Sequence, residues 1–498
     1  MKSKLSRRDF MKKSSLATAS SLALAGCAGD SEDQSSMDES GSPSISEPAR
    51  RIPVAAECDI CVIGGSSTGV FAALAAARLG ARVVIVEANG FFGGAATASL
   101  VNVWHSLYDT EEKKQIIAGL TQETIERLRW RGSYTAHYDI YTNKFCPGEF
   151  DIHTEELKIE LDELITGAGV RPFLHAFFAA PVMEDGTVKA VAIEDKSGRR
   201  AIRASYFIDA TGDGDLIARM GLPCYRNDNI QPPTTCAIIH GLEKIYKKHP
   251  EFDVHRDIFD PKYPQALKKG GAWSAKVPGS YDNTMLAATR VFGADCSDAD
   301  QLTRAEIEGR RQVRAICDIL RENFLEQGKV PLVALPAKIG IRDSRHARCL
   351  YQVKAEEVLG GKRFPDAIAN GSYPIEVQLA DREGVVVRHL DGTEEFRGAG
   401  TADKDGAWKE EEAQPATFYQ VPYRALVPRG SRNVLVAGRV IDADTYAFGA
   451  VRVMVNCNQT GEAAGTAAYC ALDSNCAVSG VDTDKLRQTM KKQGALII

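Results

Sequence analysis

The chain has 498 residues, a formal net charge of −5, and 44% hydrophobic residues. This length and composition suit a globular protein of two or three domains. The slightly acidic balance, with no basic stripe, argues against nucleic acid as a partner. No stretch beyond the N-terminal region reaches the length of a transmembrane helix.

The first 27 residues have the pattern of an export signal. The stretch SRRDFMKK (6–13) contains paired arginines, and a short stretch of small and apolar residues follows at 14–26. This arrangement is typical of the twin-arginine route. The sequence LAGC (24–27) has the pattern of a bacterial lipobox and predicts a lipid on Cys27. The alternative is a basic tail before an ordinary helix.

Residues 28–55 are predicted to be a disordered tether. They are rich in Ser, Asp, Glu and Pro, so they cannot bury enough apolar surface to offset the entropy of ordering. Together, the two segments predict a protein on the periplasmic side of the cell envelope that is anchored by its lipid.

A βαβ unit begins the folded part. An apolar run at 58–65 predicts a buried strand, the Ala-rich stretch 67–80 a helix, and 81–88 a second buried strand. The loop between the first strand and the helix has the dinucleotide-binding pattern G-x-G-x-x-G with serine at its middle glycine. Glu87 follows at the end of the second strand, where the ribose of a dinucleotide needs an acceptor.

Each loop position has an expected role. Gly64 permits the tight turn, and Gly69 permits close contact between helix and strand. Ser66 is the smallest polar substitute for glycine, and its hydroxyl can bond a phosphate oxygen. Ser67 and Thr68 add donors at the helix N-terminus, which favours an anion. We therefore expect the loop to retain dinucleotide binding.

Three further segments follow in a characteristic order. They are the glycine pair in NGFFGGAAT (89–97), the strand and turn in FIDATGDGDLIARMG (207–221), and the strand, Gly-Arg turn and Ala/Gly-rich helix of 433–468. With the first loop, this order resembles the FAD-dependent oxidoreductases of the glutathione-reductase-like superfamily, a group related to the FAD subunit of heterodisulfide reductases. The resemblance extends from about residue 56 to 475.

The resemblance implies an α/β fold: a discontinuous, Rossmann-like FAD-binding domain with an inserted mixed α+β substrate or cap domain. The FAD-binding domain would comprise 56–110, 150–224 and 429–475, the cap 111–149 and 225–428, and the C-terminal tail 476–498. The cap contains an amphipathic stretch at 303–324 that predicts a helix.

The resemblance also implies which residues bind FAD. The first loop would line the pyrophosphate, Glu87 the adenosine ribose, the second glycine pair the ribityl chain and flavin, and the last helix the flavin pyrimidine. The residues that it places at the cofactor are Gly64, Gly65, Ser66, Ser67, Thr68, Gly69, Glu87, Gly93, Gly94, Ala95, Thr97, Phe178, Thr211, Gly212, Asp213, Gly438, Arg439, Arg452 and Met454.

The cysteines do not predict a metal site. The chain has 12 cysteines, and the pair in CDIC (58–61) falls in a predicted buried strand, where cysteine acts as a small apolar residue. The chain lacks the cysteine quartet of an iron–sulfur cluster, so we assign none.

Candidate catalytic residues occur in two places. The stretch IGIRDSRHA contains Arg342 and Arg345, which can hold a carboxylate or an anionic flavin ring, with Asp343 as the residue that orients them. His105 follows the second glycine pair closely enough to reach the flavin, and histidine is a natural base for alcohol oxidation. The alternatives are an ion-pair cluster for the arginines and an interdomain contact for His105.

Several functions fit these features. The leading hypothesis is an FAD-dependent enzyme that oxidises or reduces a sugar derivative or a hydroxy/keto acid and exchanges electrons with a quinone or cytochrome. No second Gly-rich βαβ unit is present, which argues against a nicotinamide donor. The alternatives are a fumarate-reductase-like C=C reductase, with an arginine as proton donor, and a binding or scaffold lipoprotein with structural FAD.

Overall fold

The computed structural model of the chain describes residues 36–37, 43–45, 47–139, 144–268, 270–326, 329–379, 384–398, 404–409 and 414–498. The chain divides into two units, Met1–Arg51 and Ile52–Ile498. In the first unit, strands β1 (Ser36–Met37) and β2 (Pro43–Ser44) pair antiparallel. The predicted signal at 1–27, with Cys27, and much of the predicted tether lie outside the described residues.

A parallel five-stranded sheet forms part of the second unit. The strands at 60–63 and 83–86 are fully buried, which explains their continuous apolar sequences. The order of the strands is β26 (Val434–Val436), β13 (Tyr206–Asp209), β4 (Ile60–Ile63), β5 (Val83–Val86) and β9 (Arg171–Phe173). The predicted α/β class and both strands of the predicted βαβ unit are confirmed.

Two small-residue helices pack closely beside this sheet. They are α1 (Ser67–Arg78), which is the predicted helix of the βαβ unit, and α10 (Met454–Ser474). A Cβ on Gly461 would lie 2.1 Å from the backbone oxygen of Thr68, and Gly465 approaches α1 equally closely one turn later. The glycines of α10 are therefore needed because the two backbones touch.

A second sheet is antiparallel except at its last strand. It is formed by β10, β11, β12 and β3 in that order, and β12 pairs parallel with β3. Helix α4 lies next to β10. The bounds are β3 (Val54–Glu57), β10 (Phe177–Glu184), β11 (Thr187–Asp195), β12 (Gly198–Arg203) and α4 (Asp215–Arg219).

Three further helices pack in the core around α10 and α1: α2 (Gly119–Trp130), α3 (Thr154–Gly167) and α11 (Thr483–Lys492). The predicted boundaries differ here. Region 111–149 was expected in the cap, but α2 belongs to the same apolar core as α1 and α10. Residues 476–498 were expected to be a tail, but α11 is amphipathic and buries Leu486 and Met490. Burial of its apolar face holds this segment on the domain.

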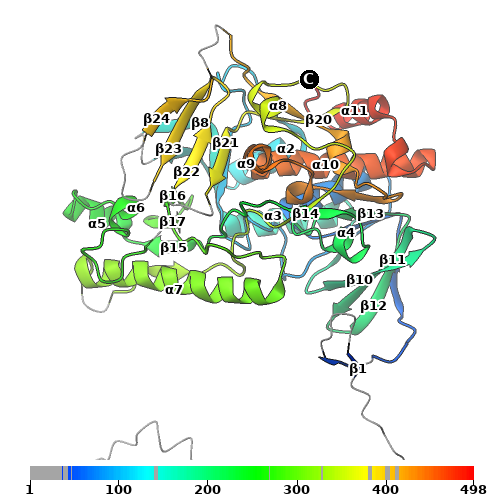
Figure 1. Ribbon diagram of the computed structural model, residues 1–498, viewed down its shortest axis with the longest axis horizontal. Coiled ribbons are helices and arrows are strands. Elements are labelled where there is room, and N and C mark those ends of the chain that lie inside the picture. Colours follow the sequence, from blue (N-terminus) through cyan, green and yellow to red (C-terminus); the bar gives the residue numbers. More distant parts are fainter. Residues whose placement is uncertain are drawn as a thin grey trace, which may run out of the picture. The chain divides into compact units, whose positions relative to one another are not determined.

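One part of the inserted region is a four-stranded sheet covered by the long helix α7 (Figure 1). Helix α7 confirms the predicted amphipathic helix at 303–324, and its apolar face packs on the sheet. The strands of this sheet are β15 (Ala237–His240), β16 (Trp273–Lys276), β17 (Asn283–Ala287) and β18 (Leu332–Ala334). The other elements of this region are β14 (Cys224–Arg226), α5 (Leu242–Lys248), α6 (Val254–Asp257), α7 (Ala299–Asn323) and β19 (Arg345–Ala347).

Helix α9 (Thr445–Val451) and strand β21 (Ile375–Gln378) are among the remaining elements, and they pack against each other. A Cβ on Gly449 of α9 would lie 2.6 Å from the backbone oxygen of Glu376 in β21, so α9 and β21 are in close contact. The elements are β6 (Val103–Trp104), β7 (Tyr134–Asp139), β8 (Lys144–Ile152), α8 (Ala355–Leu359), β20 (Ala367–Gly371), β21 (Ile375–Gln378), β22 (Val385–Arg388), β23 (Thr393–Arg397), β24 (Lys404–Ala407), β25 (Tyr419–Pro422) and α9 (Thr445–Val451).

Within the described part of the chain, no helix has the length and apolarity that crossing a bilayer requires.

Candidate active site

The first glycine loop connects β4 to α1. Gly64 has φ +101°, and a Cβ there would lie 2.3 Å from the backbone oxygen of Ala210. A Cβ on Gly69 would lie 1.9 Å from the backbone oxygen of Gly64. The structure thus shows the steric roles predicted for both glycines.

Ser66 is the N-cap of α1. Its hydroxyl accepts a hydrogen bond from the backbone N–H of Gly69 at 3.4 Å, which leaves the hydroxyl hydrogen available to donate. The side chain fits because its neighbour is Gly94, where a Cβ would lie 2.6 Å from the Cβ of Ser66. Ser67 and Thr68 follow in the first turn, both buried. A glycine in the second loop therefore makes room for serine in the first.

Glu87 connects the end of β5 to this loop. Its carboxylate is 7% exposed and accepts hydrogen bonds from the Gly65 N–H at 2.6 Å and from the backbone and side chain of Asn89 at 2.7 and 2.6 Å. A carboxylate has about four acceptor positions, so one remains for a ribose hydroxyl. Glu87 is thus held beside the loop, as predicted for the residue that recognises the ribose.

The second glycine turn lies against the first. The Gly93 N–H donates to the backbone oxygen of Gly65 at 2.8 Å, and Gly93 and Gly94 both have positive φ. Ala95 is half-buried in this turn. Thr97 is buried and donates its hydroxyl to the backbone oxygen of Phe92 at 2.6 Å, so its side chain fixes the turn.

Phe178 lies on β10, at the edge of its sheet. A bulge interrupts the pairing between Phe178 and Ala180, which frees backbone groups at this point. Arg219 donates to the Phe178 carbonyl at 2.6 Å, so that oxygen already has a partner. The predicted contact with adenine stays a prediction and falls to the other backbone groups of the bulge.

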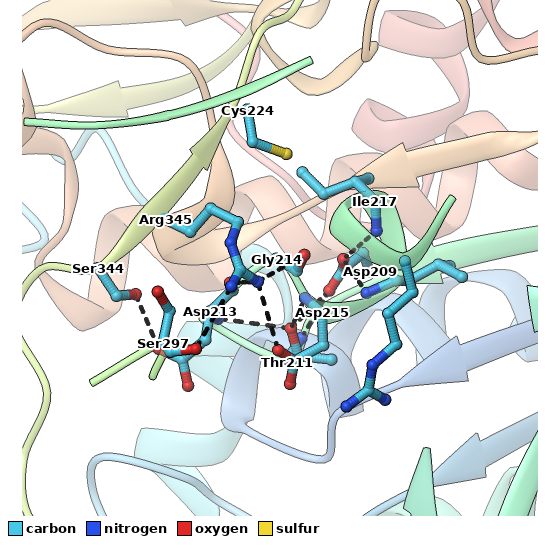
Figure 2. A network of polar contacts seen from close by, with 12 residues as sticks. Asp209, Thr211, Asp213, Gly214, Asp215, Ile217, Cys224, Ser297, Ser344 and Arg345 are labelled. Carbon is cyan, nitrogen blue, oxygen red and sulfur yellow. Dashed lines mark hydrogen bonds and ion pairs between the residues drawn. The ribbon is translucent and has the colours of Figure 1, made fainter. Parts of the chain in front are cut away.

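The turn after β13 is organised by a carboxylate that the sequence analysis did not single out (Figure 2). Asp209 is fully buried and accepts hydrogen bonds from the N–H and hydroxyl of Thr211 and from the N–H groups of Leu216 and Ile217. Burial raises its pKa to about 6. Asp209 therefore ties the end of β13 to the start of α4.

Asp213 follows in the same turn and bridges to the last part of the chain. It accepts from the Ser344 hydroxyl at 2.8 Å and from the Arg439 guanidinium at 3.2 Å. Although burial opposes it, Lys338 and Arg439 hold the pKa of Asp213 below its usual value. Gly212 is favoured beside it because its φ is +82°. The predicted pair of segments around Thr211–Asp213 and Gly438–Arg439 thus meets in space.

Arg345 belongs to this turn. Its guanidinium donates to the carbonyls of Asp213 at 3.0 Å and Ser297 at 3.3 Å, and it lies 3.6 Å from the carboxylate of Asp215 (Figure 2). Arg345 therefore fixes the nucleotide-side turn to the cap, as in the alternative of an ion-pair cluster. The prediction that it faces flavin or substrate stays a prediction.

Asp343 does not orient either arginine, contrary to prediction. Its carboxylate accepts from His346 at 2.8 Å and Asn227 at 3.3 Å, and His346 is itself fully buried. Asp343 is buried, and its carboxylate also accepts a hydrogen bond from the backbone N–H of Gln231 at 3.4 Å.

Helix α10 extends past the nucleotide loop. Gly461 lies beside Thr68 at the start of α1, and Gly465 matches the next turn, so the two helices run in the same direction. At about 1.5 Å per residue, Met454 lies about 10 Å beyond that point. The predicted contact of Arg452 and Met454 with the flavin stays a prediction.

Arg452 precedes this turn, and its Nη2 lies 3.3 Å from the carboxylate of Glu376 in β21. The hydroxyl of Tyr373 donates to the same carboxylate at 2.7 Å. His105 packs against Tyr373, with ring centroids 4.4 Å apart, and its Nδ1 lies 3.5 Å from a carboxylate oxygen of Glu149. These side chains are partly exposed and form a cluster beside the first turn of α10.

Arg342 lies near the same cluster. It donates to the backbone oxygen of Pro232 at 2.8 Å and to the hydroxyl of Thr234. Burial, together with Arg290 and Arg452, lowers the pKa of Arg342 well below its usual value. Against the effect of burial, Arg452, Tyr373 and Arg342 lower the pKa of Glu376 to about 2. Arg342 and His105, both predicted, thus meet two residues that were missed, Tyr373 and Glu376.

The described cysteines behave as predicted for CDIC. Cys58 and Cys61 are buried, and burial raises the pKa of the Cys58 thiol to about 12. The ten cysteines whose side chains the structure describes are unpaired. Within those ranges, no group of three or more His, Cys, Asp or Glu side chains could hold a metal ion.

The residues present fit a dinucleotide. Several glycines leave a cradle that a Cβ would fill, and the Nη1 of Arg439 is a buried donor with no partner at its edge. The fold and this cradle define a flavoprotein with a discontinuous Rossmann-like domain for FAD. The chain belongs to the FAD dependent oxidoreductase family, because the sequence model of that family matches residues 59–490. The protein is thus an enzyme that uses FAD.

Solved structures with similar folds are distant in sequence. A geranylgeranyl bacteriochlorophyll reductase-like protein from Thermoplasma acidophilum is 11% identical over 88% of this chain and 84% of its own, with a TM-score of 0.42. The p-nitrophenol 4-monooxygenase from Pseudomonas putida is 10% identical over 88% of this chain and 88% of its own, with a TM-score of 0.44. A flavoprotein/dehydrogenase from Cytophaga hutchinsonii is 14% identical over 87% of this chain and 83% of its own, with a TM-score of 0.42. No curated protein sequence matches the chain.

Proposed function

We propose that the protein is an exported, lipid-anchored oxidoreductase that removes a hydride from a small organic substrate, either a sugar derivative or a hydroxy acid. The observation that supports this most directly is the side-chain cluster at the first turn of α10. It brings together a histidine, a tyrosine, a carboxylate and two arginines beside the helix that the family resemblance assigns to the flavin. Such a mixture of acid–base and cationic groups is typical of an active site.

FAD supplies the hydride acceptor at flavin N5, and the protein supplies orientation, charge and proton transfer. His105 is positioned to take the proton of a substrate hydroxyl, because its Nδ1 is near Glu149 and its ring rests on Tyr373. The N-terminal end of α10 and Arg452 favour negative charge on the flavin pyrimidine. Arg342 faces the substrate from the cap.

A second candidate is the reduction of a C=C bond, with Arg342 as proton donor. One observation favours it: burial and two neighbouring arginines lower the pKa of Arg342, which makes loss of its proton easier. This reaction runs with reduced FAD and an enoate, so the two candidates differ in direction. The hypothesis of a scaffold with structural FAD instead predicts a flavin that no substrate reduces, and family membership favours an enzyme.

Export and lipid attachment rest on the N-terminal sequence. Ten cysteines have described side chains, and their unpaired state fits folding in a reducing compartment before transport by the twin-arginine route. On the outer side of the membrane, a quinone or a cytochrome is the expected electron partner. The relation to the FAD subunit of heterodisulfide reductases rests on the sequence motifs alone.

Localisation is tested by fractionation of cells that express Cys27→Ser or the double variant Arg7→Lys, Arg8→Lys. Cys27→Ser should move the protein from the membrane to the soluble periplasmic fraction, and the double variant should keep it in the cytoplasm. Unchanged distribution of both variants would contradict the proposal.

The reaction is tested by anaerobic absorbance spectra of the purified holoenzyme with sugars, polyols, hydroxy acids and enoates. Bleaching of the flavin band by a sugar or a hydroxy acid supports the proposed oxidation. Reoxidation of dithionite-reduced enzyme by an enoate, without such bleaching, favours the second candidate. A flavin that responds to none of them contradicts both.

A further inference from the structure

Asn458 is a buried residue near the start of α10 that the sequence motifs did not indicate. It is 1% exposed, and its side-chain Nδ2 has no hydrogen-bond partner. Asn456, two residues earlier, is equally buried, but its Nδ2 donates to the Tyr419 hydroxyl at 2.9 Å and to the Ala450 carbonyl at 3.1 Å. A buried donor without an acceptor is unfavourable, and native structures rarely keep one unless a ligand or a water uses it.

The packing of α10 on α1 places Asn458 in front of the first turn of α1. A Cβ on Gly461 would lie 2.1 Å from the backbone oxygen of Thr68, and Gly465 meets α1 equally closely one turn later, so the helices run side by side in the same direction. Asn458 comes three residues before Gly461 and therefore lies about 4.5 Å before the level of Thr68. Because α1 begins at Ser67, Asn458 lies about 3 Å beyond the first residue of α1.

The side chain of Asn458 faces this space. At 3.6 residues per turn, positions 458, 461 and 465 lie within about 60° of one another around α10, so Asn458 belongs to the face that packs on α1. Helical side chains lean toward the N-terminus of their helix, so the amide extends farther past the start of α1. The N-terminus of a helix favours an anion in front of it.

A second buried donor borders the same place. The N–H of Gly438 donates to the Thr460 hydroxyl at 2.9 Å, and a Cβ on Gly438 would lie 3.3 Å from the side chain of Thr68. Arg439 follows Gly438, and its Nη1 is also buried and has no partner. Two donors from separate segments thus lack an acceptor around the first turn of α1.

We propose that Asn458 donates a hydrogen bond from its side-chain amide to the pyrophosphate of FAD. The family uses FAD, and the loop that leads into α1 is the predicted pyrophosphate site, so this cofactor supplies the acceptor that the protein lacks. A hydrogen bond to a charged phosphate oxygen is stronger than one between neutral groups. The inference concerns how the cofactor is held, and it does not depend on the substrate proposed above.

Two substitutions at Asn458 test the contact. Asn458→Leu has a similar size and removes the donor, so the dissociation constant of FAD should rise at least about tenfold. Asn458→Asp keeps the shape but places a carboxylate against the phosphates, so the constant should rise by about another tenfold or more.

The matched control is Asn433→Ala. Asn433 is 5% exposed, precedes β26, and donates to the carbonyls of Val188 at 2.8 Å and Ser205 at 2.9 Å. Because this amide is fully used within the fold, its removal should lower the stability of the protein and leave the affinity for FAD unchanged. Asn458→Leu should do the opposite, because the amide that it removes has no partner in the protein.

The experiment is dialysis of each holoenzyme against graded concentrations of FAD, with ADP as a displacing ligand that carries the pyrophosphate but no flavin. Urea unfolding of the FAD-free protein measures stability in parallel. The expected result is weaker binding of both FAD and ADP by Asn458→Leu, still weaker binding by Asn458→Asp, and a stability of FAD-free Asn458→Leu equal to that of the wild type.

Three results would overturn the proposal. Unchanged dissociation constants in Asn458→Leu would exclude the contact. A loss of affinity for FAD without a loss for ADP would move the contact to the flavin half of the cofactor. A stability of FAD-free Asn458→Leu as low as that of Asn433→Ala would make the amide a structural group.

Discussion

The contact between Ser66 and Gly94 allows a quantitative test of the nucleotide cradle. In Gly94→Ala, the new Cβ lies 2.6 Å from the Cβ of Ser66, and the backbone stays at φ +55°. Overpacking costs about 1–3 kcal/mol and a left-handed conformation about 1–2 kcal/mol for a residue with a Cβ. We expect a total loss of about 2–5 kcal/mol in the free energy of unfolding and weaker FAD binding.

A second substitution separates the two costs. Ser66→Gly alone should cost only a few tenths of a kcal/mol, because glycine is an acceptable N-cap. In the double variant it removes the Cβ contact but leaves the Ser66 Cα position 3.0 Å away, so we expect recovery of about 1–2 kcal/mol. Urea unfolding followed by tryptophan fluorescence and titration of the apoprotein with FAD measure the cycle. Effects that add within about 0.5 kcal/mol would refute the contact.

Two further predictions concern α10. Gly461→Ala should lower the free energy of unfolding by about 1–3 kcal/mol because its Cβ would lie 2.1 Å from the Thr68 oxygen. Alanine is otherwise the better helix residue by about 1 kcal/mol, so a gain in urea-unfolding stability would contradict close packing. Glu462 is buried, and burial raises its pKa to about 7 from 4.5. Its stabilising effect is therefore present below pH 4.5 and lost as the pH rises through 7, which amounts to about 3 kcal/mol. Urea titrations between pH 4.5 and 8 should show this loss in the wild type and not in Glu462→Gln, and an equal pH slope in both would contradict it. His105→Asn should slow substrate reduction of the flavin at least about 100-fold with FAD content unchanged, as measured by stopped-flow absorbance, whereas an unaltered rate would exclude His105 as the base.

The nucleotide half of the protein was largely predictable because its signals are local. Buried parallel strands are continuous apolar runs, and the glycines at 64 and 69 are dictated by contacts within a few residues of the turn. The position of Glu87 beside the loop was predictable for the same reason, because it follows the end of a strand. Helix α11 was missed because a short amphipathic segment at the end of a chain resembles a polar tail until its two buried apolar residues meet α10.

Only some residues of the cluster at the first turn of α10 could be predicted, because they come from distant segments. Arg342 and His105 were suggested by sequence motifs. Tyr373, Glu376 and Arg290 belong to no motif, and they come together only through the packing of β21 against α9 and the folding of the cap. The prediction that Asp343 orients the arginines was wrong, because adjacency in sequence does not fix the direction of a side chain.

The central claim is that the protein is an FAD enzyme that removes a hydride from a hydroxy acid or a sugar derivative. The most direct measurement is the anaerobic absorbance spectrum of the purified holoenzyme during titration with hydroxy acids and sugars. The account predicts that one of these compounds bleaches the flavin band. A purified protein without flavin, or a flavin band that neither a hydroxy acid nor a sugar bleaches, would contradict it.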